Sequence, residues 1–188
     1  MQVITTEISG VKIIEPRVFH DSRGYFFESF AEGDFRREVA PGIRFVQDNE
    51  SRSTRGVVRG LHFQRPPFTQ AKLVRCTLGR VLDVAVDLRK GSATYGQYVA
   101  VELSDENKRQ LFIPRGFAHG FSVLSDEAVF QYKCDNYYSP ESEDGIDLFD
   151  ADLAVDWRTK PEEAILSAKD LNRQSFKDFD SPFVYEEI

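Results

Sequence analysis

Residues 57–63, Val-Val-Arg-Gly-Leu-His-Phe, place a histidine and an arginine in an otherwise apolar run. Histidine changes charge near neutral pH and is the side chain that most often transfers protons in enzymes, so His62 is a candidate general base. The alternative is a core histidine that merely satisfies its hydrogen bonds. The choice depends on whether the chain supplies the other groups that such a base needs.

Two side chains on other strand-like runs could act beside that base. Lys72 and Tyr132 each lie on the apolar parity of a strand-like run, so an inward-pointing ammonium group and phenol are expected. A lysine that extends to solvent from a strand edge is the alternative for Lys72. A packing residue is the alternative for Tyr132.

A carboxylate and a guanidinium group complete the set of candidates. Asp170 follows Ser167 by three positions, and this spacing also fits a helix capping box. Arg59 has the opposite strand parity to His62, so both can face one cavity only if the chain bends between them. Gly60 could provide that bend, because glycine inside a strand often marks a bulge.

A metal site is the main competing interpretation, since small β-barrels of the jelly-roll kind often hold a metal on a His-x-His pair and a later glutamate. Here His62 is followed by Phe63 and Gln64, while His20 and His119 stand alone. The number of ligands that a metal needs is not visible, and no metal is predicted. The chain also lacks the glycine-rich phosphate loops of the common nucleotide cofactors.

Many short strands are expected to position these residues. Strand-like runs lie at residues 10–19, 25–30, 43–48, 57–63, 72–78, 80–88, 97–103, 110–113, 117–124 and 128–136. Short strands separated by turn-forming residues predict an all-β antiparallel barrel of the jelly-roll kind. A short helix is expected at residues 32–39, where apolar side chains recur four apart.

The run at residues 80–88 and the last quarter of the chain indicate which residues form the core and what packs on the outside of the barrel. Residues 80–88 alternate, and the face formed by Leu82, Val84, Val86 and Leu88 is expected to be core. After residue 140 the chain is acidic, has short helical signals and carries few apolar residues. We expect this segment to be a tail packed on the barrel, so that residues 1–188 form one domain.

Charge and cysteine content limit the partners and the compartment. The 24 Lys and Arg residues against 31 Asp and Glu give a net charge of -7, which opposes general binding to nucleic acid or to an anionic membrane. An anionic ligand would need a local basic cluster. Cys76 and Cys134 form no Cys-x-x-Cys motif and are expected to be free thiols. With no signal-like or membrane-spanning segment visible, a cytoplasmic location is predicted.

Eight segments spread from near residue 20 to residue 170 carry a family resemblance. They are residues 21–28 (DSRGYFFE), 47–51 (QDNES), 58–64 (VRGLHFQ), 70–75 (QAKLVR), 79–89, 113–121 (IPRGFAHGF), 132–138 (YKCDNYY) and 166–170 (LSAKD). In this order they resemble the successive motifs of the dTDP-4-dehydrorhamnose 3,5-epimerase family.

The resemblance implies a cupin-type jelly-roll homodimer, free of metal and cofactor, that converts dTDP-4-dehydro-6-deoxy-D-glucose to dTDP-4-dehydro-L-rhamnose. In this substrate C3 and C5 flank the C4 ketone, so loss of either proton gives an enolate with its charge on the C4 oxygen. By the same resemblance His62 is the base and Asp170 orients its imidazole. Lys72 then stabilises the enolate oxygen, and Tyr132 supplies a proton from the opposite face.

The resemblance also implies a substrate-binding set. Arg23 and Arg59 are assigned to the diphosphate, since a guanidinium group donates hydrogen bonds in pairs. The residues around Arg23 would reach the site of the partner chain. The other implied residues are Gln47 and Asn49 beside the diphosphate, Phe26, Glu28 and Tyr138 at the thymidine end, and His119, Glu143 and Lys169 near the site, with Asp83 as an anchor.

Alternatives remain open at this point. Variants of the same scaffold invert only C3 or only C5, or isomerise the ketone, and they share the histidine base. Tyr132 favours double epimerisation, because an acid on the far face completes an inversion. A non-catalytic sugar-nucleotide-binding cupin would not need the four catalytic residues together, and a metal-dependent cupin oxygenase would lose its activity on chelation.

Overall fold

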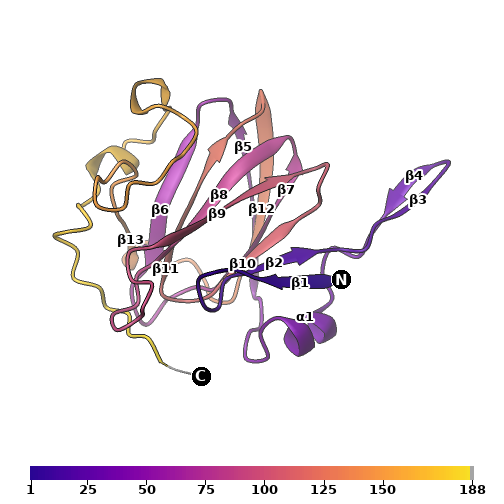
Figure 1. Cartoon of the computed structure of the whole chain (residues 1–188), viewed down its shortest axis with the longest axis horizontal. Helices are drawn as coiled ribbons and strands as arrows, with labels where there is room; N and C mark the ends of the chain where they lie inside the picture. The colour runs from indigo at the N-terminus through magenta and orange to yellow at the C-terminus, as the bar shows by residue number, and fades with distance from the viewer. Residues whose placement is uncertain (187–188) are drawn as a thin grey trace.

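The computed structural model describes residues 1–186, and most of its regular structure is β-strand arranged in two facing sheets (Figure 1). The first sheet has the strand order β1 (Gln2–Thr5), β2 (Lys12–Glu15), β10 (Gln110–Ile113), β7 (Lys72–Leu78), β12 (Glu127–Cys134) and β5 (Gln47–Thr54). The second has the order β13 (Glu143–Gly145), β6 (Val58–Gln64), β11 (Phe117–Val123), β8 (Arg80–Asp87) and β9 (Tyr98–Ser104). Neighbouring strands are antiparallel, so the prediction of an all-β jelly roll is confirmed.

Most of the predicted strands are found within a residue or two of their expected limits, but the first part of the chain differs. The run expected at residues 10–19 is divided between β2 and β3 (Phe19–Asp21), and β4 (Gly24–Phe26) is shorter than expected. β5 begins only at Gln47, near the end of the run expected at 43–48, and continues to Thr54. β1 and β13 were not predicted.

Apolar side chains from both sheets fill the space between them. Val74 and Phe130 of the first sheet pack with Val81 and Phe121 of the second. The rings of Phe121 and Phe130 stack with their centroids 4.3 Å apart. This core closes one end of the interior and leaves the other end to polar residues.

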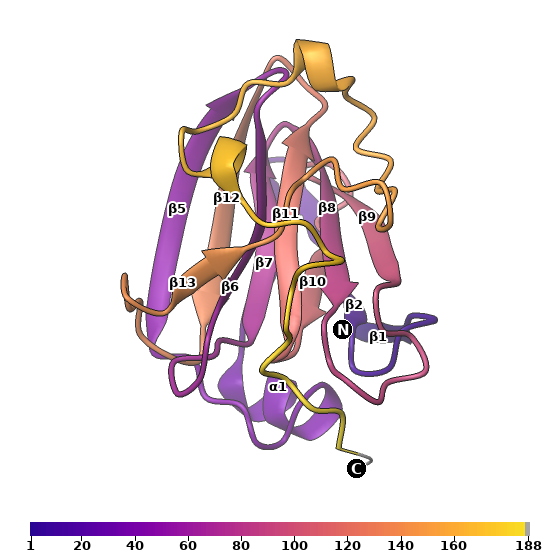
Figure 2. The same ribbon diagram turned by 90° about the vertical axis from the view of Figure 1, so that its left-hand side faces the viewer.

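The C-terminal tail covers the outer face of the second sheet, as predicted (Figure 2). Leu82, Val84, Val86 and Leu88 pack there against tail residues that include Trp157. The expected core face of β8 is therefore confirmed, but its other face is buried as well, because it points between the sheets. A strand buried on both faces explains why Asp83 and Asp87 lie in the interior.

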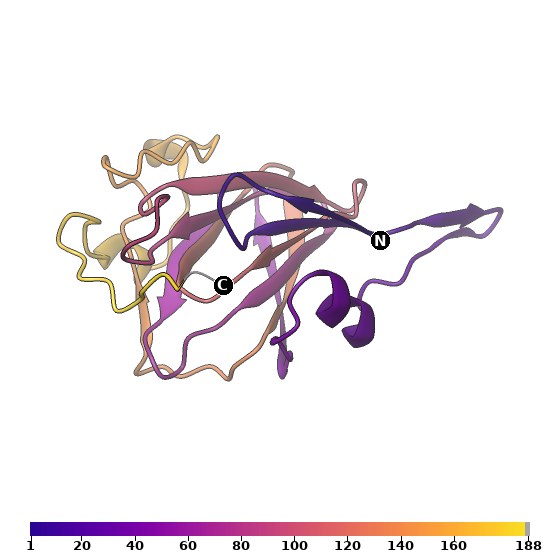
Figure 3. The ribbon, with the colours of Figure 1, turned by 60° about the horizontal axis from the view of Figure 1, so that its bottom comes forward.

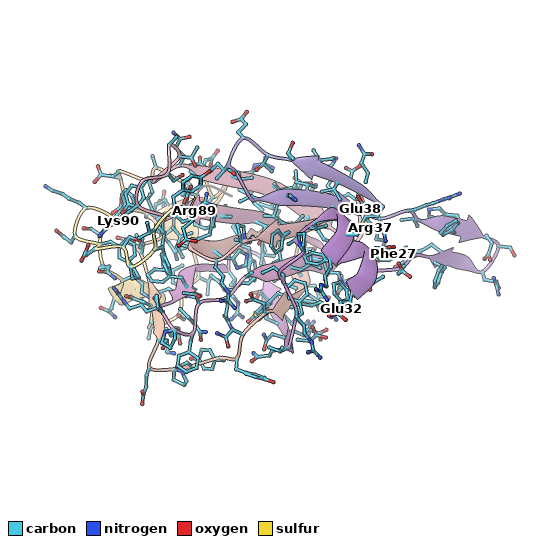
Figure 4. All side chains as sticks on the ribbon, turned by 90° about the horizontal axis from the view of Figure 1, so that it is seen from below. Phe27, Glu32, Arg37, Glu38, Arg89 and Lys90 are labelled. Atoms are coloured by element: carbon cyan, nitrogen blue, oxygen red, sulfur yellow. The ribbon has the colours of Figure 1, made fainter. Side chains whose placement is uncertain are left out.

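Short helices and one hairpin complete the fold. Helix α1 (Glu32–Glu38) lies where a helix was predicted, and the 3-10 turns η1 (Pro161–Glu163) and η2 (Asp170–Asn172) lie in the tail. The β3–β4 hairpin projects away from the sheets (Figures 1 and 3). Figure 4 places Phe27 and α1 at this end of the molecule and Arg89 and Lys90 at the other. No helix within residues 1–186 is long and apolar enough to cross a bilayer.

Candidate active site

A cavity of about 440 Å³ lies between the two sheets, at the end that the apolar core leaves open. Most of the predicted site residues line it: Gln47, Asn49, Arg59, His62, Lys72, His119, Tyr132, Tyr138, Glu143 and Lys169. They come from strands of both sheets and from the tail. The chain therefore gathers in one place residues that are scattered along its sequence.

His62 and Asp170 form a hydrogen-bonded pair at this cavity. Nε2 of His62 lies 2.5 Å from Oδ1 of Asp170, whose side chain is buried. Ser167 donates from its hydroxyl to Oδ2 of Asp170 at 2.8 Å and accepts from the Asp170 amide. The predicted helix capping box with Ser167 as the cap is therefore wrong, because the cap residue of η2 is Lys169 and it makes no side-chain cap hydrogen bond. Ser167 instead holds the Asp170 carboxylate in place.

The electrostatic environment keeps Asp170 ionised. Burial raises the pKa of this carboxyl group, but the hydrogen bonds from His62 and Ser167 outweigh burial, so its pKa lies below the ordinary value. An ionised Asp170 accepts a hydrogen bond from the Nε2–H group of His62, which leaves Nδ1 as the nitrogen with a free lone pair. His62 can therefore act as a base through Nδ1.

Gly60 brings Arg59 and His62 to the same cavity, as the sequence predicted. Its φ is +142°, and the β6–β11 register shifts between His119 and Phe121. A Cβ atom on Gly60 would lie 2.7 Å from the Cα atom of Gly120, so a side chain would push the two strands apart. Glycine at this position is therefore needed for close packing and for the shift that reorients Arg59.

Lys72 and Tyr132 enter the cavity from the sheet opposite His62. They lie on the adjacent strands β7 and β12, with Nζ of Lys72 5.8 Å from the centre of the Tyr132 ring. Burial lowers the pKa of Lys72, and this effect is opposed by Cys134, Asp83 and Glu143. Burial also raises the pKa of Tyr132, which keeps its phenol protonated and able to donate.

A second histidine–aspartate pair, His119 and Asp83, lies on the strands next to β6. His119 is paired with His62 across the β6–β11 ladder, and its Nε2 is 2.8 Å from Oδ1 of the fully buried Asp83. Burial lowers the pKa of His119 and raises that of Asp83, while each partner opposes the shift of the other. Asp83 therefore anchors His119 at the cavity wall.

A charged cluster around Glu143 forms one side of the cavity mouth. Tyr138 donates from its hydroxyl to Oε2 of Glu143 at 2.5 Å, Lys169 donates to the same oxygen at 2.9 Å, and Arg173 donates to Oε1 at 3.1 Å. Burial raises the pKa of Glu143, but these partners outweigh it and lower the pKa to about 2. Glu143 therefore joins Tyr138 to the tail segment that carries Asp170.

Arg23, Phe26 and Glu28 lie away from this cavity within the single chain. Arg23 is on the exposed hairpin, where it forms an ion pair with Asp21 at 2.5 Å. Phe26 and Glu28 line a separate cavity of about 270 Å³ near the base of the hairpin. Their assignment to the substrate stays a prediction that requires a second chain.

Several lining residues were not assigned from the sequence. Gln64 and Gln70 lie inside the segments 58–64 and 70–75 that carried the resemblance, so inspecting those segments for polar inward positions could have found them. Cys134 also lines the cavity and accepts a weak hydrogen bond from Asn49 at 3.8 Å. Arg173 does not line the cavity but pairs with Glu143, which does, and it lies in a tail without periodicity where no sequence signal indicates its position.

The arrangement is suited to moving protons on and off a molecule held between the sheets. His62 faces the cavity from one sheet, the phenol of Tyr132 faces it from the other, and the ammonium group of Lys72 lies beside the phenol. Arg59 supplies the local positive charge that an anionic ligand requires in this acidic chain. Among residues 1–186, no group of three or more His, Cys, Asp or Glu side chains is arranged to hold a metal ion.

Comparison with known proteins finds relatives that match almost the whole chain. The family model of dTDP-4-dehydrorhamnose 3,5-epimerase matches residues 5–178. The dTDP-4-dehydrorhamnose 3,5-epimerases of Shigella flexneri and Escherichia coli K12 are 55% and 56% identical to this chain over 180 and 170 residues, covering 96% and 90% of it and 98% and 91% of their own lengths. The crystal structure of a dTDP-6-deoxy-D-glucose-3,5-epimerase from Legionella pneumophila in complex with dTDP-4-keto-L-rhamnose has a TM-score of 0.95 and 49% identity, covering 99% of each chain.

Proposed function

The chain belongs to the dTDP-4-dehydrorhamnose 3,5-epimerase family, and we propose that it inverts C3 and C5 of dTDP-4-dehydro-6-deoxy-D-glucose to form dTDP-4-dehydro-L-rhamnose for dTDP-L-rhamnose biosynthesis. The proposal extends to residue roles in a reaction without a cofactor. The observation that carries it is the placement of His62 and Tyr132 on opposite sheets with one cavity between them. Inversion at a carbon needs a base on one face and an acid on the other.

The first step is removal of a proton next to the ketone. Nδ1 of His62 takes the proton from C3 or C5, while Asp170 holds the imidazole through Nε2 and stabilises the imidazolium that forms. The electron pair of the broken C–H bond moves into the ring, and the C4 carbonyl oxygen becomes an enolate oxygen.

Lys72 stabilises that oxygen. Its ammonium group is held in a desolvated wall of the cavity, where a positive charge acts more strongly on a developing negative charge than it would in water. The side chain of Lys72 shares this wall with Tyr132, which places the cation on the side from which the acid acts.

Tyr132 completes each inversion. Its phenol donates a proton to the carbanionic carbon from the face opposite His62, which re-forms the ketone with the configuration inverted. His62 ends the step protonated and Tyr132 ends it deprotonated. Both residues must therefore exchange protons with water before the second centre is inverted.

Family membership also supports proposals for how the nucleotide end of the substrate is bound and for the assembly. Arg59 lines the cavity together with Gln47 and Asn49, which supports the proposal that it binds the diphosphate, and we propose that Tyr138 at the mouth contacts the thymine ring. We propose that the chain is a homodimer in which the hairpin bearing Arg23 completes the partner's site. The homodimer and the cytoplasmic location stay predictions.

The test is solvent labelling. Incubation with the 4-keto nucleotide sugar in deuterated water should place deuterium at both C3 and C5, detected by proton NMR as loss of both signals. Label at one carbon only would indicate a single-centre epimerase or a ketoisomerase instead. Unchanged activity after exhaustive chelation is expected too, since the proposed steps use protein side chains alone.

A further inference from the structure

The turn that carries Asp170 has little apolar packing to hold it in place. Within η2, Leu171 is 67% exposed and Asn172 is exposed as well, while Lys169 just before it also faces solvent. Only Asp170 itself is buried there. Because a misplaced orienting carboxylate would leave the base in the wrong geometry, contacts outside the turn must fix it.

Arg173 makes one enclosed contact of this kind. Its side chain is 12% exposed and pairs with Glu143, whose side chain is 16% exposed, at 3.1 Å. Its stem lies over Gly145 of β13, where an added Cβ would be 3.0 Å from Nε of Arg173. Gly145 is paired directly with His62 in the β13–β6 ladder. Arg173 therefore fastens the tail three residues after Asp170, beside the strand that carries the base.

Lys169 also pairs with Glu143, but it is a weaker anchor. Its side chain is 67% exposed, so water and salt screen its interaction with the carboxylate. The Arg173–Glu143 pair is more enclosed, with side chains 12% and 16% exposed, so solvent screens this interaction less. Of the two cations around Glu143, Arg173 is the one that can hold the tail.

We infer that Arg173 is a positioning residue, which holds Asp170 against His62 through its ion pair with Glu143. The inference rests on the proposed function, because it assigns to Arg173 the maintenance of the catalytic pair. The positive charge of Arg173 supports this role, since it adds to the hydrogen bonds that offset burial and keep the pKa of Asp170 low. Arg173 does not touch the cavity itself, so it acts only through its neighbours.

The first experiment compares kcat with KM in purified Arg173→Met, which keeps an unbranched stem and removes the charge. Small displacements of a catalytic group can cost about 100-fold in rate, so kcat should fall by about 10- to 100-fold while KM for the nucleotide sugar changes little. Arg173→Lys should recover part of the loss, because an ammonium group can still pair with Glu143. Arg158→Met is the matched control: Arg158 lies in the same tail, pairs with Glu102 at 3.1 Å and is exposed, and its loss should leave kcat unchanged.

A double-mutant cycle separates positioning from a general structural effect. In an Asp170→Asn background, Arg173→Met should cause no further loss of kcat, because the contact that it supports is already broken. An equal loss in both backgrounds would overturn the inference, as would wild-type kcat in Arg173→Met. If Arg173→Met does not fold, as judged by near-ultraviolet circular dichroism, Arg173→Lys goes through the same cycle. An inactive wild type would refute the proposed function instead, so the two failures are distinguishable.

Discussion

Oδ1 of Asp170 lies 2.5 Å from Nε2 of His62, although 108 positions separate the two residues in the chain. One belongs to a central strand of the second sheet and the other to a 3-10 turn of the tail. The His62–Asp170 pair therefore exists only when the tail is docked on the sheet. His62 and Asp170 can be tested separately from Lys72 and Tyr132, which face the cavity from the opposite sheet.

Replacement of His62 should abolish proton exchange. In His62→Ala no base remains to take the proton from C3 or C5, and loss of a positioned base typically costs about 10²–10⁴-fold in rate. The measurement is deuterium incorporation into the nucleotide sugar over time. Exchange at the wild-type rate in a folded His62→Ala protein would remove His62 from the mechanism.

Replacement of Tyr132 should separate exchange from inversion. In Tyr132→Phe the ring still packs, but the phenol that protonates the second face is gone, so His62 returns a proton to the face it came from. We expect deuterium at the substrate carbons without formation of the inverted product, as read by NMR coupling constants. Normal product formation by this variant would show that another group is the acid.

Lys72 should govern the alkaline side of the pH profile. Enolate stabilisation needs the protonated ammonium, and burial lowers the pKa of Lys72 below its ordinary 10.5. Activity is therefore present below that pKa and falls as pH rises through it, so kcat/KM should decline before pH 10.5 is reached. Lys72→Met should lose about 10²–10³-fold in kcat at neutral pH, as for removal of an oxyanion donor. A Lys72→Met protein with unchanged kcat would contradict this role.

Ionised Glu143 should stabilise the folded state at neutral pH, and this stabilisation should be lost in acid. Its pKa is lowered from 4.5 to about 2 in the folded chain, so the folded state favours the ionised form. The contribution is complete above about 4.5 and disappears as pH falls towards about 2. Urea midpoints should show Glu143→Gln to be less stable than wild type at neutral pH, with the difference shrinking across this window. Glu141→Gln, at an exposed position in the turn just before β13, should show no such convergence.

Shared sites between two chains should allow complementation. If the hairpin of one chain completes the site of its partner, a mixed dimer of Arg23→Ala and His62→Ala contains one intact site, and mixing the inactive proteins should restore activity. His62→Ala mixed with Lys72→Met is the control, because both defects lie in the body of the chain and every site keeps one of them. Equal recovery in the two mixtures, or none in the first, would refute the shared site.

The fold was predictable wherever apolar residues alternate. β7 and β10 begin and end where the sequence predicted, because their inward side chains pack in a dry core. β5 was placed too early because its sequence, Gln-Asp-Asn-Glu-Ser-Arg-Ser-Thr, is entirely polar. Its half-buried positions Gln47, Asn49 and Ser51 line the cavity, so the period of two is present without hydrophobicity.

The site was predictable only in part from local patterns. Strand parity correctly predicted that Lys72 and Tyr132 point inward. Gly60 correctly predicted the irregularity that brings Arg59 and His62 to one cavity. The pairing of His62 with Asp170 depends on how the tail crosses the second sheet, and only the family resemblance suggested it. No sequence pattern singled out Arg173, because its proposed role depends on its contacts with Glu143 and Gly145 in the folded chain.

Trp157, the single tryptophan of the chain, is buried in the same tail that delivers Asp170. Its indole donates to the carbonyl of Leu148 at 2.6 Å, and its ring lies where a Cβ on Gly120 of β11 would approach it within 3.0 Å. Indole fluorescence responds to such an enclosed setting, so the emission of this protein reports docking of the tail. During refolding, the change in Trp157 fluorescence and the return of turnover should therefore appear together, because both require the tail to dock on the second sheet.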